Sequence, residues 1–402
     1  MKLYAPWEKA FNKAYTPFEE FLHAQTTTGI VLMFTTVLAL MLANSPLADA
    51  YKHFFHIQID FNVGSWKLSH SIHHWINDGL MAVFFFIVGL EIKREILVGE
   101  LSNIKVAILP ILAAIGGMIL PALIYLSINY GTDAASGWGI PMATDIAFAI
   151  SALVLLGKRV SPALVTFLVA LAIVDDLGAV VVIAIFYTEQ INMLPLALAL
   201  VSFLTLVSFN RFGIHAVLPY FIIGLAMWFF MLESGVHATI AGVIAAMSIP
   251  SKPKYAPVDF TKHTKNLLDE YDNYPVTTDH MMHEKQKAIL LNITDKIDSV
   301  NSPAARLEHD LHLPVSLVVI PLFALANAGI SIDFSSISTT ILEPISIGII
   351  AGLIIGKVLG IAGVAYIAIK LGIAKLPDNS TMSQLFGVAF LGGIGFTMSI
   401  FV

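Results

Sequence analysis

Long apolar stretches recur along the whole of this 402-residue chain and dominate its sequence. A helix needs about 20 residues to cross the hydrocarbon core of a bilayer. Because these stretches are continuous and do not alternate apolar with polar residues, they predict transmembrane helices rather than barrel strands. We therefore expect an all-α polytopic membrane protein with about eleven transmembrane helices. The stretches span residues 27–44, 74–98, 106–128, 138–156, 162–187, 194–210, 212–232, 236–249, 312–330, 345–371 and 383–402.

The composition excludes several classes of protein. Charged residues make up 12% of the chain and hydrophobic residues 57%, whereas soluble proteins carry roughly 25% charged residues. A soluble enzyme or a disordered protein is therefore excluded. The net charge of −6 gives no attraction for nucleic acid. The absence of cysteine removes disulfides and thiolate metal sites.

The charges divide the chain into four parts. Residues 1–26 form an amphipathic N-terminal segment, which we expect to be cytoplasmic or to lie on the membrane surface. Residues 27–250 hold predicted transmembrane helices 1–8, and residues 311–402 hold helices 9–11. Between them, 251–310 carry 18 of the 50 charged residues and form a cytoplasmic insert. Its histidines, His263, His280 and His283, indicate either a metal or pH sensor or a solvated linker.

The basic residues indicate the orientation of the chain. If the segments between successive stretches alternate sides, 19 of the 22 Lys and Arg residues fall on the side of the N-terminus. Cytoplasmic loops of membrane proteins are rich in Lys and Arg. The N-terminus is therefore predicted to be cytoplasmic, and residues 45–73 are predicted to form an outer loop.

Two adjacent carboxylates, Asp175 and Asp176, lie at the centre of the apolar stretch from Ala163 to Thr188. Ionisable groups inside a membrane span are costly, and they mark transport paths by default. On a helix the two side chains point about 100° apart, so they face different neighbours. We interpret the pair as an ion-binding or proton-binding site.

A third acidic residue, Asp145, follows Thr144 just after Pro141. The proline predicts a broken helix, because it lacks a backbone donor and disfavours helix in the residue before it. A carboxylate there can neutralise exposed N–H groups at a helix end. The alternative is an ordinary helix N-cap at the membrane edge. A second break is predicted in GGIGFTMSIF, residues 392–401, where glycines and Thr397 interrupt an apolar run.

Lys357 also lies inside a predicted span. A buried lysine needs a partner or loses its proton, and Asp145, Asp175 and Asp176 are the available partners. The alternative is that the side chain reaches the membrane interface.

Other titratable residues lie near the ends of the spans. Asp78 is either a helix N-cap or an accessory functional residue, and Glu91 is expected in a cytoplasmic funnel. His237 is either a hydrogen-bonded residue at a helix end or a functional one. Three further histidines either bind a metal ion or form a hydrated face at the membrane interface; these are His70, His73 and His74. His309 and His312 are expected to titrate near neutrality.

Six motifs occur in order from Trp75 to Phe401: WINDGLMAVFFFIVGLEIKRE, IPMATDIAFA, LAIVDDLGA, SGVHATIAGV, IPLFALANAG and GIGFTMSIF. In these motifs the chain resembles the NhaA-type sodium/proton antiporters of bacterial inner membranes. The resemblance implies an inverted-repeat fold of twelve helices, in which the fourth and eleventh are unwound and cross. The twelfth helix is then expected to be missing here, since the eleventh stretch reaches Val402. The insert 251–310 is also longer than the loop typical of the family.

The resemblance implies exchange of Na+ or Li+ for H+ by alternating access, regulated by pH, without a cofactor and without enzymatic activity. It implies that Asp175 and Asp176 bind the cation and the protons. Asp145 and Lys357 would balance the half-helix dipoles, and Thr144 would lie at the crossing. The pH response would involve Glu91, Glu308, His309 and His237. The expected partners are Na+, H+ and the lipid bilayer, with a homodimer left open. The alternative function is a sodium-coupled symporter of a small solute.

Overall fold

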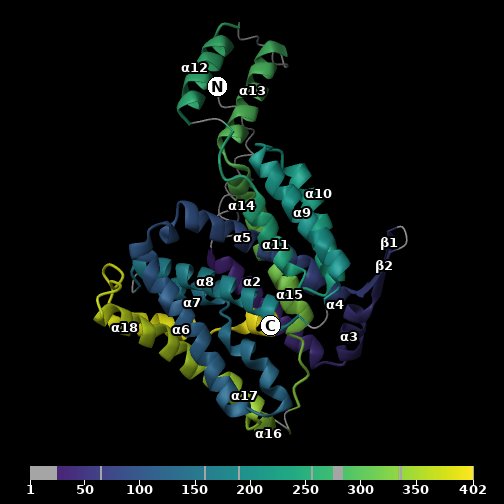
Figure 1. The fold of residues 1–402 in the computed structure, drawn as a ribbon, viewed down its shortest axis with the longest axis vertical. Helices are drawn as coiled ribbons and strands as arrows, with labels where there is room; N and C mark the ends of the chain where they lie inside the picture. The colour runs from purple at the N-terminus through teal and green to yellow at the C-terminus, as the bar shows by residue number, and fades with distance from the viewer. Residues whose placement is uncertain are drawn as a thin grey trace, which may run out of the picture.

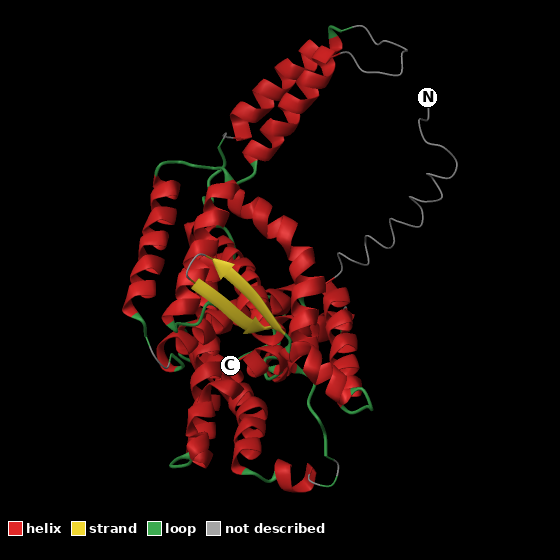
Figure 2. Ribbon diagram, turned by 90° about the vertical axis from the view of Figure 1, so that its right-hand side faces the viewer, coloured by secondary structure: helices red, strands yellow, loops and turns green. Residues whose placement is uncertain are grey.

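The computed structural model describes residues 25–63, 66–157, 160–188, 191–254, 257–274, 284–333, 335 and 337–401. Almost all of the predicted N-terminal segment 1–26 lies outside these residues. The described chain is mainly helical, and its helices pack into one body from which a helical hairpin projects (Figures 1 and 2).

Six helices are long and apolar enough to cross a membrane, or up to eight if two bent pairs each count as one span. Three of them are α6 (Ile104–Asn129), α8 (Pro162–Phe186) and α9 (Met193–Arg211), and a fourth is α10 (Val217–Ser234). The other two, Pro303–Asn327 and Pro344–Lys370, contain π-helical turns. The first comprises α14 (Pro303–Pro314), η5 (Val315–Val319) and α15 (Ile320–Asn327). The second includes α17 (Pro344–Ala351), η6 (Gly352–Gly356), η7 (Leu359–Gly363) and α18 (Val364–Lys370). The transmembrane, helical class is confirmed, and the count of eleven stays a prediction.

Further helices complete the body. They are α2 (Gln25–Ala43), α3 (Ala48–His56), α4 (Ile72–His74), η1 (Trp75–Leu80), α5 (Met81–Leu97), η2 (Glu100–Ser102), α11 (Thr239–Ser248) and α16 (Ile337–Ile341). The α5–α11 pair packs closely because glycine replaces a side chain at the contact. A Cβ on Gly242 would lie 2.2 Å from the carbonyl oxygen of Ala82, and one on Gly89 would lie 2.8 Å from Cβ of Ala246. Lys93 also joins these helices, because its ammonium donates to the carbonyls of Met247 and Ile249.

One part of the chain departs from the predicted helical pattern, because residues 58–63 and 66–71 are strands. Two antiparallel strands, β1 (Gln58–Val63) and β2 (Trp66–Ser71), form a hairpin with Gln58 paired to Ser71 (Figure 2). The sequence pattern predicts a single outer loop over residues 45–73. However, residues such as Ile59 and Phe61 alternate with polar residues at the period of a strand.

Both predicted helix breaks are present. The first separates η3 (Asp133–Met142) from α7 (Ile146–Leu155), which are bent by 41°, with Ala143, Thr144 and Asp145 between them. The second separates α19 (Met382–Leu391) from α20 (Phe396–Phe401). The two breaks touch, because the N–H of Asp145 donates to the carbonyl of Ile394 at 2.7 Å. A Cβ on Gly395 would lie 3.0 Å from the carbonyl oxygen of Ala143, so a larger residue would crowd this approach.

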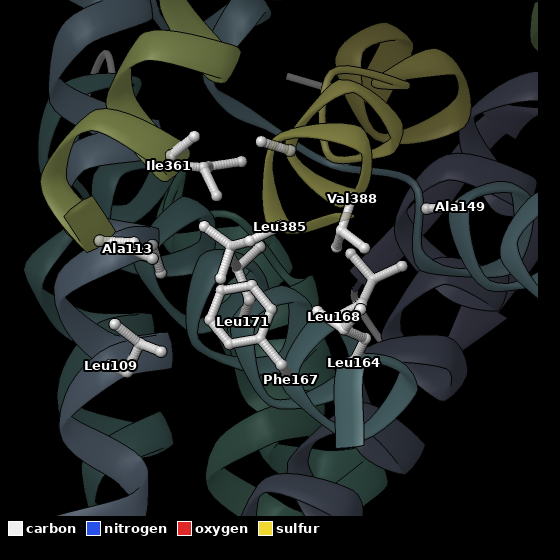
Figure 3. Close-up of a cluster of buried hydrophobic side chains, with 14 of the residues drawn as sticks. Leu109, Ala113, Ala149, Leu164, Phe167, Leu168, Leu171, Ile361, Leu385 and Val388 are labelled. Carbon is white, nitrogen blue, oxygen red and sulfur yellow. The ribbon is translucent and has the colours of Figure 1, made fainter. Parts of the chain in front are cut away.

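A large apolar cluster packs beside the two breaks (Figure 3). It joins α6, α7, α8, η7 and α19 through fully or almost fully buried side chains. Among them are Leu109, Ala113, Ala149, Leu164, Phe167, Leu168, Leu171, Ile361, Leu385 and Val388. The half-helices α7 and α19 are therefore held against α8, which carries the paired aspartates.

The insert contains the projecting hairpin, formed by α12 (Pro257–Asp272) and α13 (Glu284–Val300), at one end of the molecule (Figure 1). The following membrane helix begins at Pro303, earlier than the predicted residue 312. Of the three histidines considered as a sensor, His263 lies in α12, while His280 and His283 lie outside the described residues. Within the described ranges, no group of three or more His, Cys, Asp or Glu residues is placed to hold a metal ion.

Candidate functional site

The paired aspartates lie in the second half of α8 and are almost completely buried. Asp175 and Asp176 each have 1% of their surface exposed. As the helical geometry predicts, they face different neighbours: Asp175 contacts a lysine, and Asp176 lines a cavity. Two carboxylates without water around them are costly, and each needs compensation by a partner or a ligand.

Lys357 is the partner of Asp175. Its ammonium lies 2.7 Å from Oδ2 of Asp175 and 2.8 Å from the hydroxyl oxygen of Thr144, and its surface is 0% exposed. The side chain therefore does not reach the membrane interface, and the structure selects one partner from the three that the sequence allows. Oδ1 of Asp175 has no hydrogen-bond partner among the described residues.

Thr144 connects this ion pair to the second helix break. While its hydroxyl oxygen accepts from Lys357, its hydroxyl group donates to the carbonyl of Gly392 at 2.8 Å. Gly392 immediately follows α19, so its carbonyl belongs to the negative end of that half-helix. Lys357 and Thr144 thus place a cation and a hydroxyl donor near a helix C-terminus.

Asp145 caps two half-helices at once. Its Oδ1 accepts the N–H of Phe148 at 3.0 Å, which caps α7. Its Oδ2 accepts the N–H of Thr397 at 3.2 Å and also the Thr397 hydroxyl, at the start of α20. The residue is only 2% exposed. Asp145 is therefore an N-cap, but one buried in the break rather than at a membrane edge, and its charge faces two positive helix ends.

The sequence interpretation gives no role to Thr397, and the structure links it to Asp145. We expect Thr397→Val to lower the melting temperature and the rate of ion transport, because it removes a hydrogen bond to a buried carboxylate, a loss of about 1.5–3 kcal/mol. The matched control is Ser399→Ala, since the Ser399 hydroxyl is buried two residues away without a partner among the described residues. Equal effects of the two variants would show that the contact with Asp145 is unimportant.

Asp176 faces a cavity of about 300 Å³. Neither of its carboxylate oxygens has a hydrogen-bond partner within the described part of the chain. The same cavity is lined by Asp145 and Thr397 from the two breaks. Carboxylate oxygens that are buried, unpartnered and open to a cavity can take either a proton or a hard cation.

The rest of the cavity lining includes a charged group formed by Glu91, Arg94, Glu308 and His312. Arg94 Nε donates to Oε1 of Glu308 at 2.8 Å, and Nδ1 of His312 lies 3.8 Å from Oε1 of Glu91. Glu91 and Arg94 lie on α5, whereas Glu308 and His312 lie on α14. The cavity thus connects these partly exposed charges with the buried carboxylate of Asp176.

Only two of the four residues expected in the pH response line this cavity, namely Glu91 and Glu308. His309 is exposed and is not part of the lining. His237 lies between α10 and α11, where it interacts electrostatically with Asp78. The sequence gives no role to Arg94, although it occurs in the same LEIKRE segment as Glu91.

Asp78 lies apart from the cavity. It is in the π-helical turn η1, and its Oδ2 lies 3.3 Å from Nδ1 of His74. Its backbone carbonyl accepts the indole N–H of Trp228 at 2.8 Å. The interpretation of Asp78 as a helix N-cap is wrong, because the cap at the start of this segment is Ser71, which accepts the N–H of His74.

Known proteins resemble this chain over nearly its whole length. A family model described as "Na+/H+ antiporter 1" matches residues 19–402. The chain belongs to this family. Within it, the chain is 75% identical over 402 residues to a protein of Sulfurimonas denitrificans described as an Na+/H+ antiporter NhaA, covering 100% of this chain and 90% of that protein. It is 48% identical to an NhaA 1 antiporter of Saccharophagus degradans, covering 98% and 86%, and 47% identical to an NhaA of Dichelobacter nodosus, covering 99% and 86%.

Membership of the Na+/H+ antiporter 1 family confirms the resemblance drawn from the six motifs. Together with the apolar helices, it makes the chain a multi-pass membrane protein. The relatives are named as transporters rather than enzymes.

Proposed function

We propose that this chain is a secondary active antiporter that expels Na+, or Li+, in exchange for protons by alternating access. The single observation that carries this proposal is Asp176, whose two buried carboxylate oxygens have no partner among the described residues and face a cavity. The names of the family and of its members support the same transported ions.

We propose that Na+ and H+ compete for Asp175 and Asp176. Sodium is a hard cation that favours oxygen ligands. Both oxygens of Asp176 and one of Asp175 have no hydrogen-bond partner among the described residues and are available as ligands. A cation near Asp175 also competes with the ammonium of Lys357, which lies 2.7 Å away. Two carboxylates can take up two protons but share one sodium ion. More protons than sodium ions are then exchanged in each cycle, and the exchange is electrogenic.

Alternating access needs an element with two arrangements, and we propose that the broken helices are this element. We propose that they belong to an inverted-repeat fold, since the two breaks contact each other beside α8. Neutralisation of their helix ends by Asp145 and Lys357 would then permit the buried breaks to persist while the site changes sides.

Reconstitution tests the function directly. Purified protein in proteoliposomes should collapse an imposed pH gradient when Na+ is added, without any organic solute, as reported by a pH-sensitive dye inside the vesicles. A dependence on an added solute would identify the sodium-coupled symporter, which the comparisons do not favour. Sodium flux without proton movement would contradict both functions and indicate a passive channel.

We propose that the charged cavity group contributes to regulation by pH. Glu308→Gln removes the negative charge that pairs with Arg94, so we expect it to shift the pH profile of exchange. His309→Gln is the matched control on the same helix, since His309 does not line the cavity. If both profiles equal that of the wild type, competition between Na+ and H+ at the aspartates is sufficient to explain the pH dependence.

We propose a location in the bacterial inner membrane with the N-terminus in the cytoplasm, on the basis of the basic residues. The chain has no cysteine, so single cysteines report orientation without background labelling. Lys52→Cys in α3 should react with an impermeant maleimide in intact cells, whereas Lys252→Cys should react only in everted vesicles. Both lysines are exposed. The reverse pattern would overturn the orientation. A homodimer and the absence of a cofactor stay predictions.

A further inference from the structure

Histidine side chains gather where β2 meets α4. The rings of His70 in β2 and His74 in α4 are stacked, with centroids 4.1 Å apart and planes 18° from parallel. Nδ1 of His74 also lies 3.3 Å from Oδ2 of Asp78. Nε2 of His74 is buried without a hydrogen-bond partner among the described residues. This group is distant in sequence from the paired aspartates and has no place in the exchange mechanism above.

An open cavity of about 590 Å³ reaches the stacked rings. Its lining comes from three separate parts of the chain: the hairpin and α4, the segment 191–193, and residues 232–235 at the end of α10. Figure 1 places β1, β2 and α4 beside this end of the α9–α10 pair. All three parts fall in the segments that the sequence assigns to the outer side, so the cavity gives protons from that side access to the rings.

We propose that His70 and His74 form a second proton-binding site, at which acid in the outer compartment separates the β-hairpin from the helical segment that leads into α5. The ligand is the proton rather than a metal ion, because no group of three metal-ligating side chains occurs in the described part of the chain. The identity of the compartment rests on the orientation proposed above, whereas the site itself does not.

The charges around the stack determine its response to pH. Burial and the neighbouring His74 lower the pKa of His70, while Glu233 and Asp78 oppose this effect. A histidine whose pKa is lowered by a contact stabilises that contact above its ordinary pKa, about 6.5, and the stabilisation is lost as the pH falls below that value. Two imidazolium rings at this separation repel each other. The other titratable groups that face the cluster are His56 in α3, His73 in α4 and His237 before α11.

The hairpin is coupled to the transport region through η1. His74 immediately precedes this π-helical turn, which continues into α5, the helix that carries Glu91. The side chains of Asn77 in η1 and Asn327 at the end of α15 form two hydrogen bonds, of 2.8 and 3.3 Å. Both α5 and α15 contribute to the cavity at Asp176. A change at the histidine stack therefore acts on two helices of the transport site.

Spin-label distances test this proposal in the full-length protein. Ile59→Cys in β1 and Leu194→Cys in α9 are exposed positions on the hairpin and across the outer cavity, and the native chain has no cysteine to interfere. The distance between labels, measured in nanodiscs by pulsed electron paramagnetic resonance, should increase or broaden as the pH falls from 8 to about 5, with its midpoint near or below the ordinary histidine pKa of about 6.5.

Three variants of the spin-labelled protein distinguish electrostatic repulsion within the histidine stack from a general loosening of the hairpin. His70→Gln removes one of the two charges and should leave the distance constant over the same pH range. Glu233→Gln removes a charge that stabilises protonated His70 in the stack, so opening should occur at a higher pH. His53→Gln, an exposed histidine on α3 outside the cluster, should behave as the wild type.

A wild-type distance that does not change with pH would overturn the proposal, and so would a pH-dependent change that persists in His70→Gln. Exchange by the His70→Gln protein at pH 8 shows that it is folded. If exchange is absent from every preparation while the distances follow the expected pattern, the proposed antiport fails and the proton site stands.

Discussion

Replacing Asp176 with asparagine is expected to reduce Na+/H+ exchange to the background of vesicles without the protein. The change keeps the size of the side chain and removes the charge that would compensate a bound cation. Asp176 is 1% exposed and has no hydrogen-bond partner among the described residues. Since burial of an unpaired carboxylate is itself unfavourable, the variant should fold at least as stably as the wild type. Dye-monitored exchange in everted vesicles and the melting temperature of the purified protein measure the two expectations.

The matched control is Asp133→Asn, which removes an exposed carboxylate at the start of η3 and should leave exchange intact. Wild-type exchange by Asp176→Asn, from protein present in the membrane at the normal level, would contradict the assignment of the cation site. Loss of exchange together with loss of the protein from the membrane would instead assign Asp176 a structural role.

Much of the candidate site follows from the sequence, because a charge in an apolar stretch is visible without knowledge of the fold. Asp175 and Asp176 stand out at the centre of their stretch, and helical geometry correctly places them against different neighbours. The two breaks were predictable for a similar reason. Pro141 precedes the first break, and glycines occupy the second, so each leaves a local signature.

Contacts between distant segments could not be predicted in this way. The sequence allows Lys357 three acidic partners, and only the folded structure, which brings Lys357 next to Asp175 and Thr144, selects Asp175. The contact between Thr397 and Asp145 was equally unpredictable, because the two residues lie 252 positions apart in the sequence. The same is true of Glu308 and His309, which are adjacent in the chain although only Glu308 lines the cavity. The hairpin was missed because a short amphipathic strand pair resembles a polar loop beside long apolar helices.

Replacing Lys357 with glutamine is expected to lower the free energy of unfolding by about 3–5 kcal/mol, because it leaves the buried charge of Asp175 without its partner. Lys357 is 0% exposed and lies 2.7 Å from Asp175, so water cannot take the place of the ammonium. The hydroxyl of Thr144 also loses its donor. A lower melting temperature of the purified protein measures the effect, and Lys375→Gln, an exposed lysine after α18, is the control.

The double variant Asp175→Asn with Lys357→Gln distinguishes a specific ion pair from a general need for lysine at this position. Breaking a buried pair is far more costly than removing both charges, which is often nearly neutral. The double variant should therefore be more stable than Lys357→Gln alone, and a double-mutant cycle gives the coupling energy. Additive losses from the two single changes would mean that the pair contributes no coupling. In that case Lys357 would stabilise the fold mainly through Thr144, whose hydroxyl donates to the carbonyl of Gly392 after α19.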